Sequence, residues 1–140
     1  MTISPRLTLM IAISAVVVCG MLAGLKRTTE VTPRGSVVVT LYRPYPLEAG
    51  LAWQAAKHML PVDLKALSPY ADDPKVEGGY SPVMIYEDGK PLGPAHSNFR
   101  DISKLGQGRF TYWIGQGLIF STSDGSDPNT NGRRYWAVVP

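Results

Sequence analysis

The chain has little of what most chemical sites require. It contains 140 residues but only one cysteine, Cys19, which excludes a disulfide within the chain and a zinc site built on cysteines. Its two histidines, His58 and His96, lie 38 positions apart with no HxxxH or HExxH spacing, so no metal motif contains them. The nucleophile-elbow pattern GxSxG is also missing. We therefore expect no enzyme activity, no cofactor and no metal.

Charge of one sign is equally sparse. The net charge is +3, from 14 basic and 11 acidic residues, and the longest basic runs are the pairs Lys26-Arg27 and Arg133-Arg134. A nucleic-acid footprint requires basic residues clustered in a stripe. The sequence therefore predicts no nucleic-acid partner.

One long apolar run stands at the start of the chain. Residues 7–25, LTLMIAISAVVVCGMLAGL, contain no charge and are bracketed by Arg6 and Lys26-Arg27. As a helix this stretch is roughly 28 Å long, close to the thickness of the hydrocarbon layer. We expect a transmembrane helix over residues 7–25, after a tail over residues 1–6. The segment therefore predicts a lipid bilayer as one partner.

Two other readings of this run stay open. A cleaved signal peptide has a shorter apolar region and a small-x-small cleavage site, which is not clear here. A lipoprotein signal would use Cys19, but Val18 precedes it where a small residue is expected. Small residues at helical spacing favour close packing against a second membrane helix, and the candidates for that face are Gly20, Gly24, Ala15 and Ala23.

The flanking charges differ only slightly between the two sides of the predicted membrane helix, so they indicate its orientation weakly. Arg6 stands on one side against Lys26, Arg27 and Arg34 on the other, which leans toward a cytoplasmic domain. A six-residue tail is nevertheless typical of an anchor whose domain is exported, and the domain is rich in Tyr, Trp, Gly and Asn. We expect the inner (cytoplasmic) membrane of a bacterium, with the domain on the periplasmic side.

The rest of the chain is dominated by strand and turn signals. After a polar linker over residues 26–35, we expect a mainly β domain over residues 36–140, a small antiparallel sheet or sandwich with one or two short helices. The expected strands cover 36–42, 83–86, 90–92, 109–114, 118–121 and 132–139. Helices are expected over 47–60 and after the capping residue Asn98 up to Leu105, with Gly106 as the stop, and a long loop over 61–82. Asp88-Gly89 is typical of a hairpin turn, and residues 115–117 are expected to turn the chain.

Two groups of residues are candidate contact sites. Strand alternation separates Tyr112 from Trp113 and Tyr135 from Trp136, so one set belongs to the core and the other can face a sugar or a partner protein. Core packing on both faces, with loops that cover the second face, is the equally weighted alternative. Asp124, Asp127 and Asn129, with Ser126, lie in a polar loop with oxygens suited to Ca²⁺, although the EF-hand order is not met. An ordinary turn explains the same loop.

Residues 86–136 resemble a short β element of bacterial proteins related to envelope polysaccharide. The resemblance rests on YEDGKPLGPAHSNFRDISKLGQGRF and LIFSTSDGSDPNTNGRRY, most specifically on residues 121–135. Some of those proteins are sugar- or methyl-transferases to which the element is appended, and it has no assigned activity. The resemblance implies a recurring β module in a glycan context.

These observations favour a non-catalytic accessory subunit. One membrane helix with a small-residue face, long Pro/Gly-rich loops and no catalytic set are typical of a protein that stabilises a larger membrane complex, such as a respiratory, photosynthetic or export assembly. Integral membrane proteins are then the expected partners. The alternative is a membrane-tethered carbohydrate-binding module of the cell envelope.

Overall fold

The computed structural model describes residues 31–55 and 61–140, and residues Val31–Pro140 form one compact unit. The predicted membrane helix over residues 7–25, including Gly20, Gly24, Ala15 and Ala23, lies outside the described residues. Within the described ranges, the helices are all too short or too polar to cross a bilayer.

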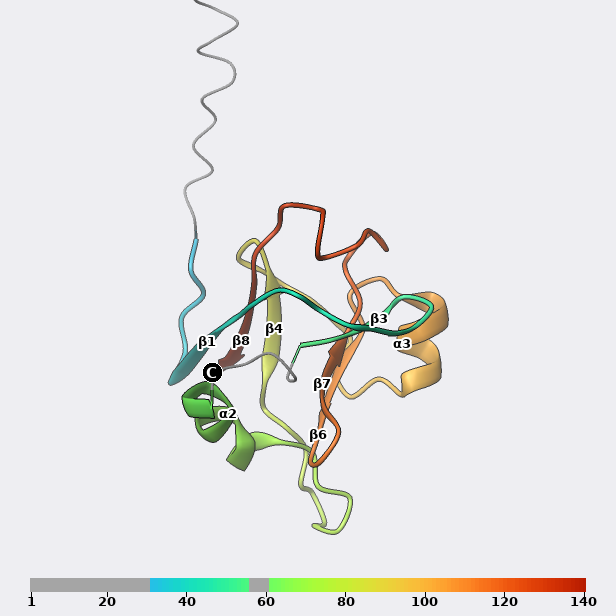
Figure 1. The fold of residues 1–140 in the computed structure, drawn as a ribbon. Coiled ribbons are helices and arrows are strands. Elements are labelled where there is room, and N and C mark those ends of the chain that lie inside the picture. The colour runs from blue at the N-terminus through green and yellow to red at the C-terminus, as the bar shows by residue number, and fades with distance from the viewer. Residues whose placement is uncertain (1–30, 56–60) are drawn as a thin grey trace, which may run out of the picture. The chain divides into compact units, whose positions relative to one another are not determined.

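The domain is mainly β, as predicted, with two four-stranded antiparallel sheets (Figure 1). The first sheet has the order β1-β8-β4-β5, and the second has the order β2-β3-β7-β6. The first sheet contains β1 (Val37–Leu41), β8 (Tyr135–Val139), β4 (Met84–Glu87) and β5 (Lys90–Pro91). The second contains β2 (Leu47–Ala49), β3 (Ala52–Gln54), β7 (Gly117–Phe120) and β6 (Phe110–Trp113).

The main core combines side chains from both sheets. Tyr135 from β8 and Phe120 from β7 are fully buried, and their ring centroids lie 5.1 Å apart. Tyr45, just after β1, meets both rings edge-on at 5.4 and 5.7 Å. Aromatic pairs in this arrangement contribute attraction beyond their buried area. The three rings therefore bind the two sheets together.

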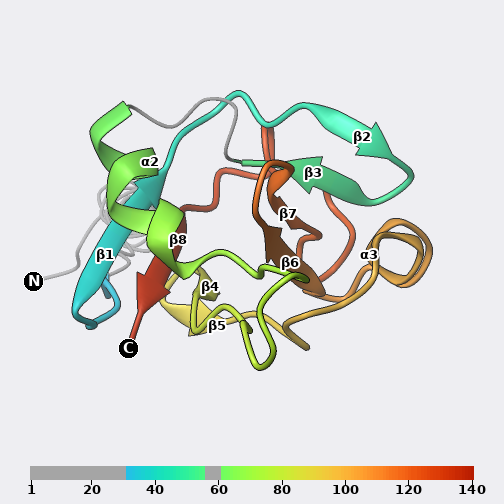
Figure 2. The same cartoon turned by 90° about the horizontal axis from the view of Figure 1, so that it is seen from below.

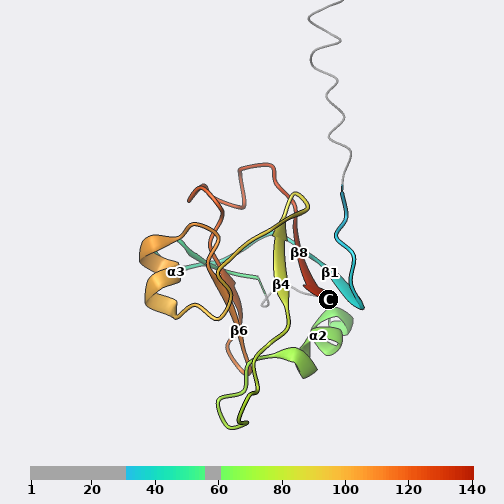
Figure 3. The same ribbon diagram turned by 180° about the vertical axis from the view of Figure 1, so that it is seen from behind.

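Two short helices cover the sheets at different places (Figures 1 and 3). Helix α3 (Phe99–Leu105) lies outside the second sheet, where Ile102 packs with Ala52 and Ile119. Its limits follow the sequence signals: Asn98 accepts the Asp101 N–H as the N-cap, and Gly106 ends the helix with φ of 60°.

Helix α2 (Pro61–Leu67) was not predicted, because residues 61–82 were expected to be a loop throughout. Proline is well suited to the first turn of a helix, where its missing N–H has no partner to lose. Leu67, at the end of the helix, is fully buried in the main core. A 3₁₀ turn, η2 (Ser68–Tyr70), follows directly (Figure 2).

The predicted helix over 47–60 is wrong for its described part. Residues 47–54 form the hairpin β2–β3, with Gly50 at φ of 54° in the turn and the Leu51 N–H bonded to the Ser103 carbonyl of α3. The alternation of Ala52 and Gln54, both buried, suits the sheet better than a helix. Residues 56–60 lie outside the described part.

The remaining predicted turns and strands agree with the structure. Asp88 and Gly89 take φ of 48° and 79° in the turn between β4 and β5, as their sequence predicts. The turn that joins β6 to β7 covers residues 114–116, one residue before the expected 115–117, and the last strand begins at Tyr135 rather than Gly132.

Part of the predicted linker packs on the domain. Pro33 is buried, and a Cβ at Gly89 would lie 2.6 Å from the Val31 carbonyl oxygen. The Ser36 N–H donates to the Val139 carbonyl at 2.8 Å, and a Cβ at Gly35 would lie 2.4 Å from the same oxygen. Residues 31–36 are therefore held against the first sheet.

Candidate functional site

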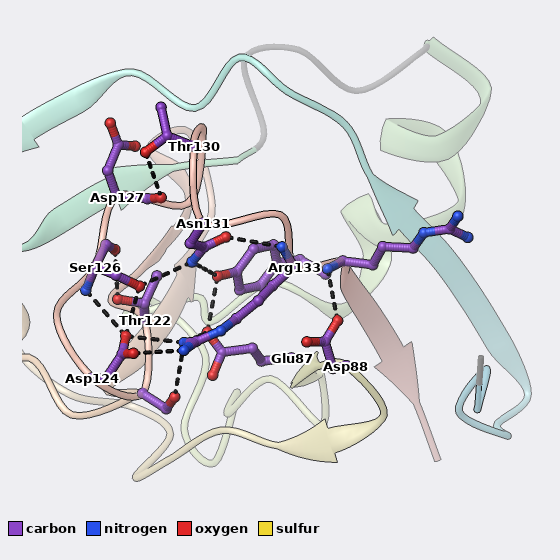
Figure 4. Close-up of polar contacts among 12 residues, drawn as sticks. Glu87, Asp88, Thr122, Asp124, Ser126, Asp127, Thr130, Asn131 and Arg133 are labelled. Carbon is purple, nitrogen blue, oxygen red and sulfur yellow. Dashed lines mark hydrogen bonds and ion pairs between the residues drawn. The ribbon is translucent and has the colours of Figure 1, made fainter. Parts of the chain in front are cut away.

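The polar loop after β7 is held by its own side chains (Figure 4). Arg133 forms an ion pair with Asp124 through both guanidinium nitrogens and donates to Glu87 Oε1 at 3.0 Å. The same Glu87 oxygen accepts the Tyr135 hydroxyl at 2.8 Å, and Asn131 donates to that hydroxyl. The loop is thereby fastened to the end of β4.

Each carboxylate in this network lies in direct contact with the Arg133 guanidinium. Hydrogen bonds from Arg133, then from Ser126, hold the pKa of the Asp124 carboxyl well below its usual range. The bonds to Asp124 and Glu87 raise the pKa of Arg133 further. Burial raises the pKa of Tyr135, so its hydroxyl stays protonated at neutral pH. The network is a set of satisfied charges, typical of a structural fastening.

The predicted calcium-type oxygens are used for the same purpose. Asp127 accepts the Asn129 N–H at 2.8 Å, while Asn129 exchanges two hydrogen bonds with the backbone of Tyr45 at 2.7 and 3.0 Å. In the part of the chain that the structure describes, no three His, Cys, Asp or Glu residues stand together as a metal site. The turn interpretation of this loop therefore accounts for the positions of Asp124, Asp127 and Asn129.

The candidate aromatic residues have unequal surroundings. Tyr112, Tyr135 and Trp136 are buried, with Trp136 only 3% exposed although it points away from the main core. They therefore do not form the open platform that the sequence suggested. Trp113, at the end of β6, remains partly exposed.

Trp113 belongs to a pocket that the sequence did not predict. The pocket has a volume of about 960 Å³ and lies between the loop over residues 72–80 and residues 113–116, which comprise the end of β6 and the turn after it, with His96 in its wall. Both segments are close together in Figures 1 and 3. A volume of this size suits a small ligand.

Asp72 organises one side of the pocket. Its backbone pairs with β6: the Asp72 N–H donates to the Tyr112 carbonyl at 2.7 Å, and its carbonyl accepts the Ile114 N–H at 3.0 Å. Its buried carboxylate accepts the Ser81 N–H and lies 3.2 Å from His96 Nδ1. One residue thus fixes the loop, the edge of β6 and the histidine ring.

His96 is held in an unusual backbone conformation. Its φ is 54°, a region that residues with a Cβ occupy uncommonly, and such residues collect at functional sites. The ring meets Tyr80 edge-on at 5.3 Å between centroids. A carboxylate beside Nδ1 fixes the orientation of an imidazole, but among the residues that the structure describes no serine, cysteine or threonine lines this pocket to act as a nucleophile.

Apolar side chains surround the polar centre of the pocket. Tyr80 is 74% exposed, Val76 is 55% exposed and Ile114 is 53% exposed, and all three line the pocket. Exposed large apolar residues that gather at one concave place are typical of a binding site. The only sequence signal was the length of the Pro/Gly-rich stretch over 61–82, because Asp72, Tyr80 and His96 belong to no recognisable motif.

Comparison with known proteins adds no relative. No family model, no curated protein and no solved structure matches the chain.

Proposed function

We propose that the protein is a non-catalytic, single-pass accessory subunit whose β domain contacts an integral membrane protein at the bilayer surface. The observation that carries this proposal is the attachment of residues 31–36 to the first sheet. The Ser36 N–H bond to Val139 and the close approach of Val31 to Gly89 fix this segment as part of the domain.

The attachment makes the tether short. The predicted membrane helix ends at Leu25, so residues 26–30 alone separate it from the fixed segment. Five extended residues reach about 17 Å. A domain on such a tether stays at the membrane surface, where laterally diffusing membrane proteins meet it at a high effective concentration.

The predicted helix supplies the second half of the interaction. Gly20 and Gly24, with Ala23 beside them, give the helix a small-residue face that admits a second helix closely, whereas Ala15 falls on the other side of the helix. Helix packing inside the bilayer and domain contact outside it then hold the same partner. A respiratory, photosynthetic or export complex of the bacterial inner membrane, with the domain on the periplasmic side, is the class of assembly proposed.

Replacement of the small-residue face tests this arrangement. The double variant Gly20→Leu/Gly24→Leu should lose its partners when the tagged protein is purified from its own membranes in mild detergent. The control Val18→Leu/Leu22→Val changes side-chain volume on the opposite helical face and should keep them. Equal recovery of partners with both double variants would refute the helix contact.

A further inference from the structure

We propose that the pocket between residues 72–80 and 113–116 binds a neutral saccharide. The saccharide site is independent of the accessory role, so glycan binding and co-purification succeed or fail separately. Its position differs from the aromatic platform expected from the sequence, because Trp113 alone of those aromatics lines it.

The pocket is preorganised on both sides. Within the loop, the Asp73 N–H donates to the Gly79 carbonyl at 3.0 Å and the Gly79 N–H donates to the Val76 carbonyl at 3.0 Å. Asp72 binds the base of the loop to β6. A ligand therefore loses little affinity to ordering of the loop.

The lining combines aromatic faces with both donors and acceptors. A pyranose ring has an apolar C–H face and a rim of hydroxyls, each of which donates and accepts. Tyr80 and Trp113 offer rings for the apolar face. Asp73 and Glu77 accept hydrogen bonds, whereas Lys75 and the Gln116 amide donate them. This mixture fits a polyhydroxylated ligand better than a purely apolar one.

A peptide added as an extra strand does not fit this edge. Along the outer side of β6, Phe110 already exchanges hydrogen bonds with Pro94 and Ser97, and Tyr112 and Ile114 bond to Asp72. Strand addition requires these backbone groups to be free. The β6 edge beside the pocket is therefore closed to that mode of recognition.

Anionic ligands are disfavoured by charge. Three carboxylates, those of Asp72, Asp73 and Glu77, line the pocket against the single ammonium group of Lys75. A uronic acid or a phosphorylated glycan would bring further negative charge to this place. Neutral sugars meet no such repulsion, so we expect the ligand to be a saccharide without acidic groups.

The test uses the full chain in detergent micelles. The probes are an array of neutral, amino-sugar, uronic-acid and phosphorylated oligosaccharides. A tri-arginine peptide is added to test whether the pocket binds a basic peptide instead of a sugar. We expect binding of at least one neutral oligosaccharide, confirmed by calorimetric titration, and none of the uronic-acid or phosphorylated members. Absence of any neutral binder, or binding of the peptide or charged glycans alone, would overturn the proposal.

Variants then locate the binding. Tyr80→Ala, at an exposed position, and Trp113→Ala should each weaken binding about tenfold or more. Tyr42→Ala is the matched control, since Tyr42 is likewise an exposed tyrosine but does not line the pocket. If Trp113→Ala fails to fold, Tyr80→Ala and Gln116→Ala still decide the question. Equal loss in Tyr42→Ala, or unchanged binding in Tyr80→Ala, would contradict the assignment.

Discussion

Arg133 Nη1 lies 3.0 Å from Oε1 of Glu87, and this contact joins a surface loop to a buried carboxylate. The Glu87 side chain is 7% exposed, so water compensates little for a lost partner. Arg133 also holds Asp124, so a single guanidinium pairs with two carboxylates. Charge pairing therefore fastens the loop over residues 121–133 to the end of β4.

Removal of Arg133 should destabilise the domain. In Arg133→Ala, the Tyr135 hydroxyl is the one side-chain partner that Glu87 keeps among the described residues, and we expect a loss of about 2 kcal/mol in the free energy of unfolding. Urea denaturation at neutral pH measures the change. Arg100→Ala removes the same charge from the exposed surface of α3 and should change stability little. Similar losses in both variants would contradict the assigned role.

Acid should lower the stability of the domain by protonating Asp124, which breaks its ion pair with Arg133. Its carboxyl has a folded-state pKa below the ordinary 3.8, because Arg133 and Ser126 donate to it. A lowered pKa gives stability that is present above the unfolded-state pKa and lost as pH falls below it. Asp124→Asn should therefore show a smaller loss of stability than the wild type between neutral pH and pH about 3.

The comparison of urea midpoints at the two pH values gives this difference directly. Glu77→Gln is the control, because Glu77 is exposed and its removal should leave the acid dependence unchanged. An Asp124→Asn variant with the full wild-type acid dependence would contradict the prediction.

High pH should lower the stability of the domain because the unfolded chain releases tyrosine protons that the folded domain retains. Burial raises the pKa of Tyr45 from 10.0 to about 12, and it raises the pKa of Tyr112 in the same direction. The unfolded chain then loses protons that the folded chain retains, so stability is full below pH about 10 and falls as pH rises through the folded pKa values. Tyr45→Phe should reduce the fall between pH about 10 and about 12.

At neutral pH the same substitution has a separate cost. The Tyr45 hydroxyl donates to the Leu41 carbonyl at 2.6 Å, and its loss should lower stability by about 1 kcal/mol. Denaturation curves at several pH values, with tyrosinate absorbance as the second signal, separate the two effects. An unchanged alkaline slope in Tyr45→Phe would contradict the burial argument.

Gly35→Ala tests the attachment of residues 31–36. The added Cβ would lie 2.4 Å from the Val139 carbonyl oxygen and from Val138 Cγ1, so the segment must move away from β8. We expect a loss of about 1 to 3 kcal/mol in stability. Gly93→Ala is the control, because its nearest neighbour would lie at 3.9 Å. Equal stability of the Gly35 variant and the wild type would mean that the segment is not held.

Local signals in the sequence predicted much of the β architecture. The Asp88-Gly89 turn, the Asn98 cap and the Gly106 stop each depend on chemistry within a few residues, and the structure has all three. The β2–β3 hairpin was missed because apolar spacing near Leu51 suits a helix too. The tertiary bond from Leu51 to Ser103 decides against it.

The pocket could not be predicted in the same way. Asp72 and His96 are 24 positions apart, and neither belongs to a motif, so only the folded chain brings them together. Burial of Trp136 agrees with the alternative in which both faces are packed, and the sequence could not decide for it, since strand alternation separates the two faces of a sheet but does not say what covers each one.

Purification of the tagged protein from its own membranes decides whether it is an accessory subunit. The complex is extracted in mild detergent, its mass is measured by light scattering after size exclusion, and its components are identified by mass spectrometry. We expect a larger assembly that contains integral membrane proteins in fixed stoichiometry. Recovery of the protein alone, at the mass of one chain, would refute the accessory role.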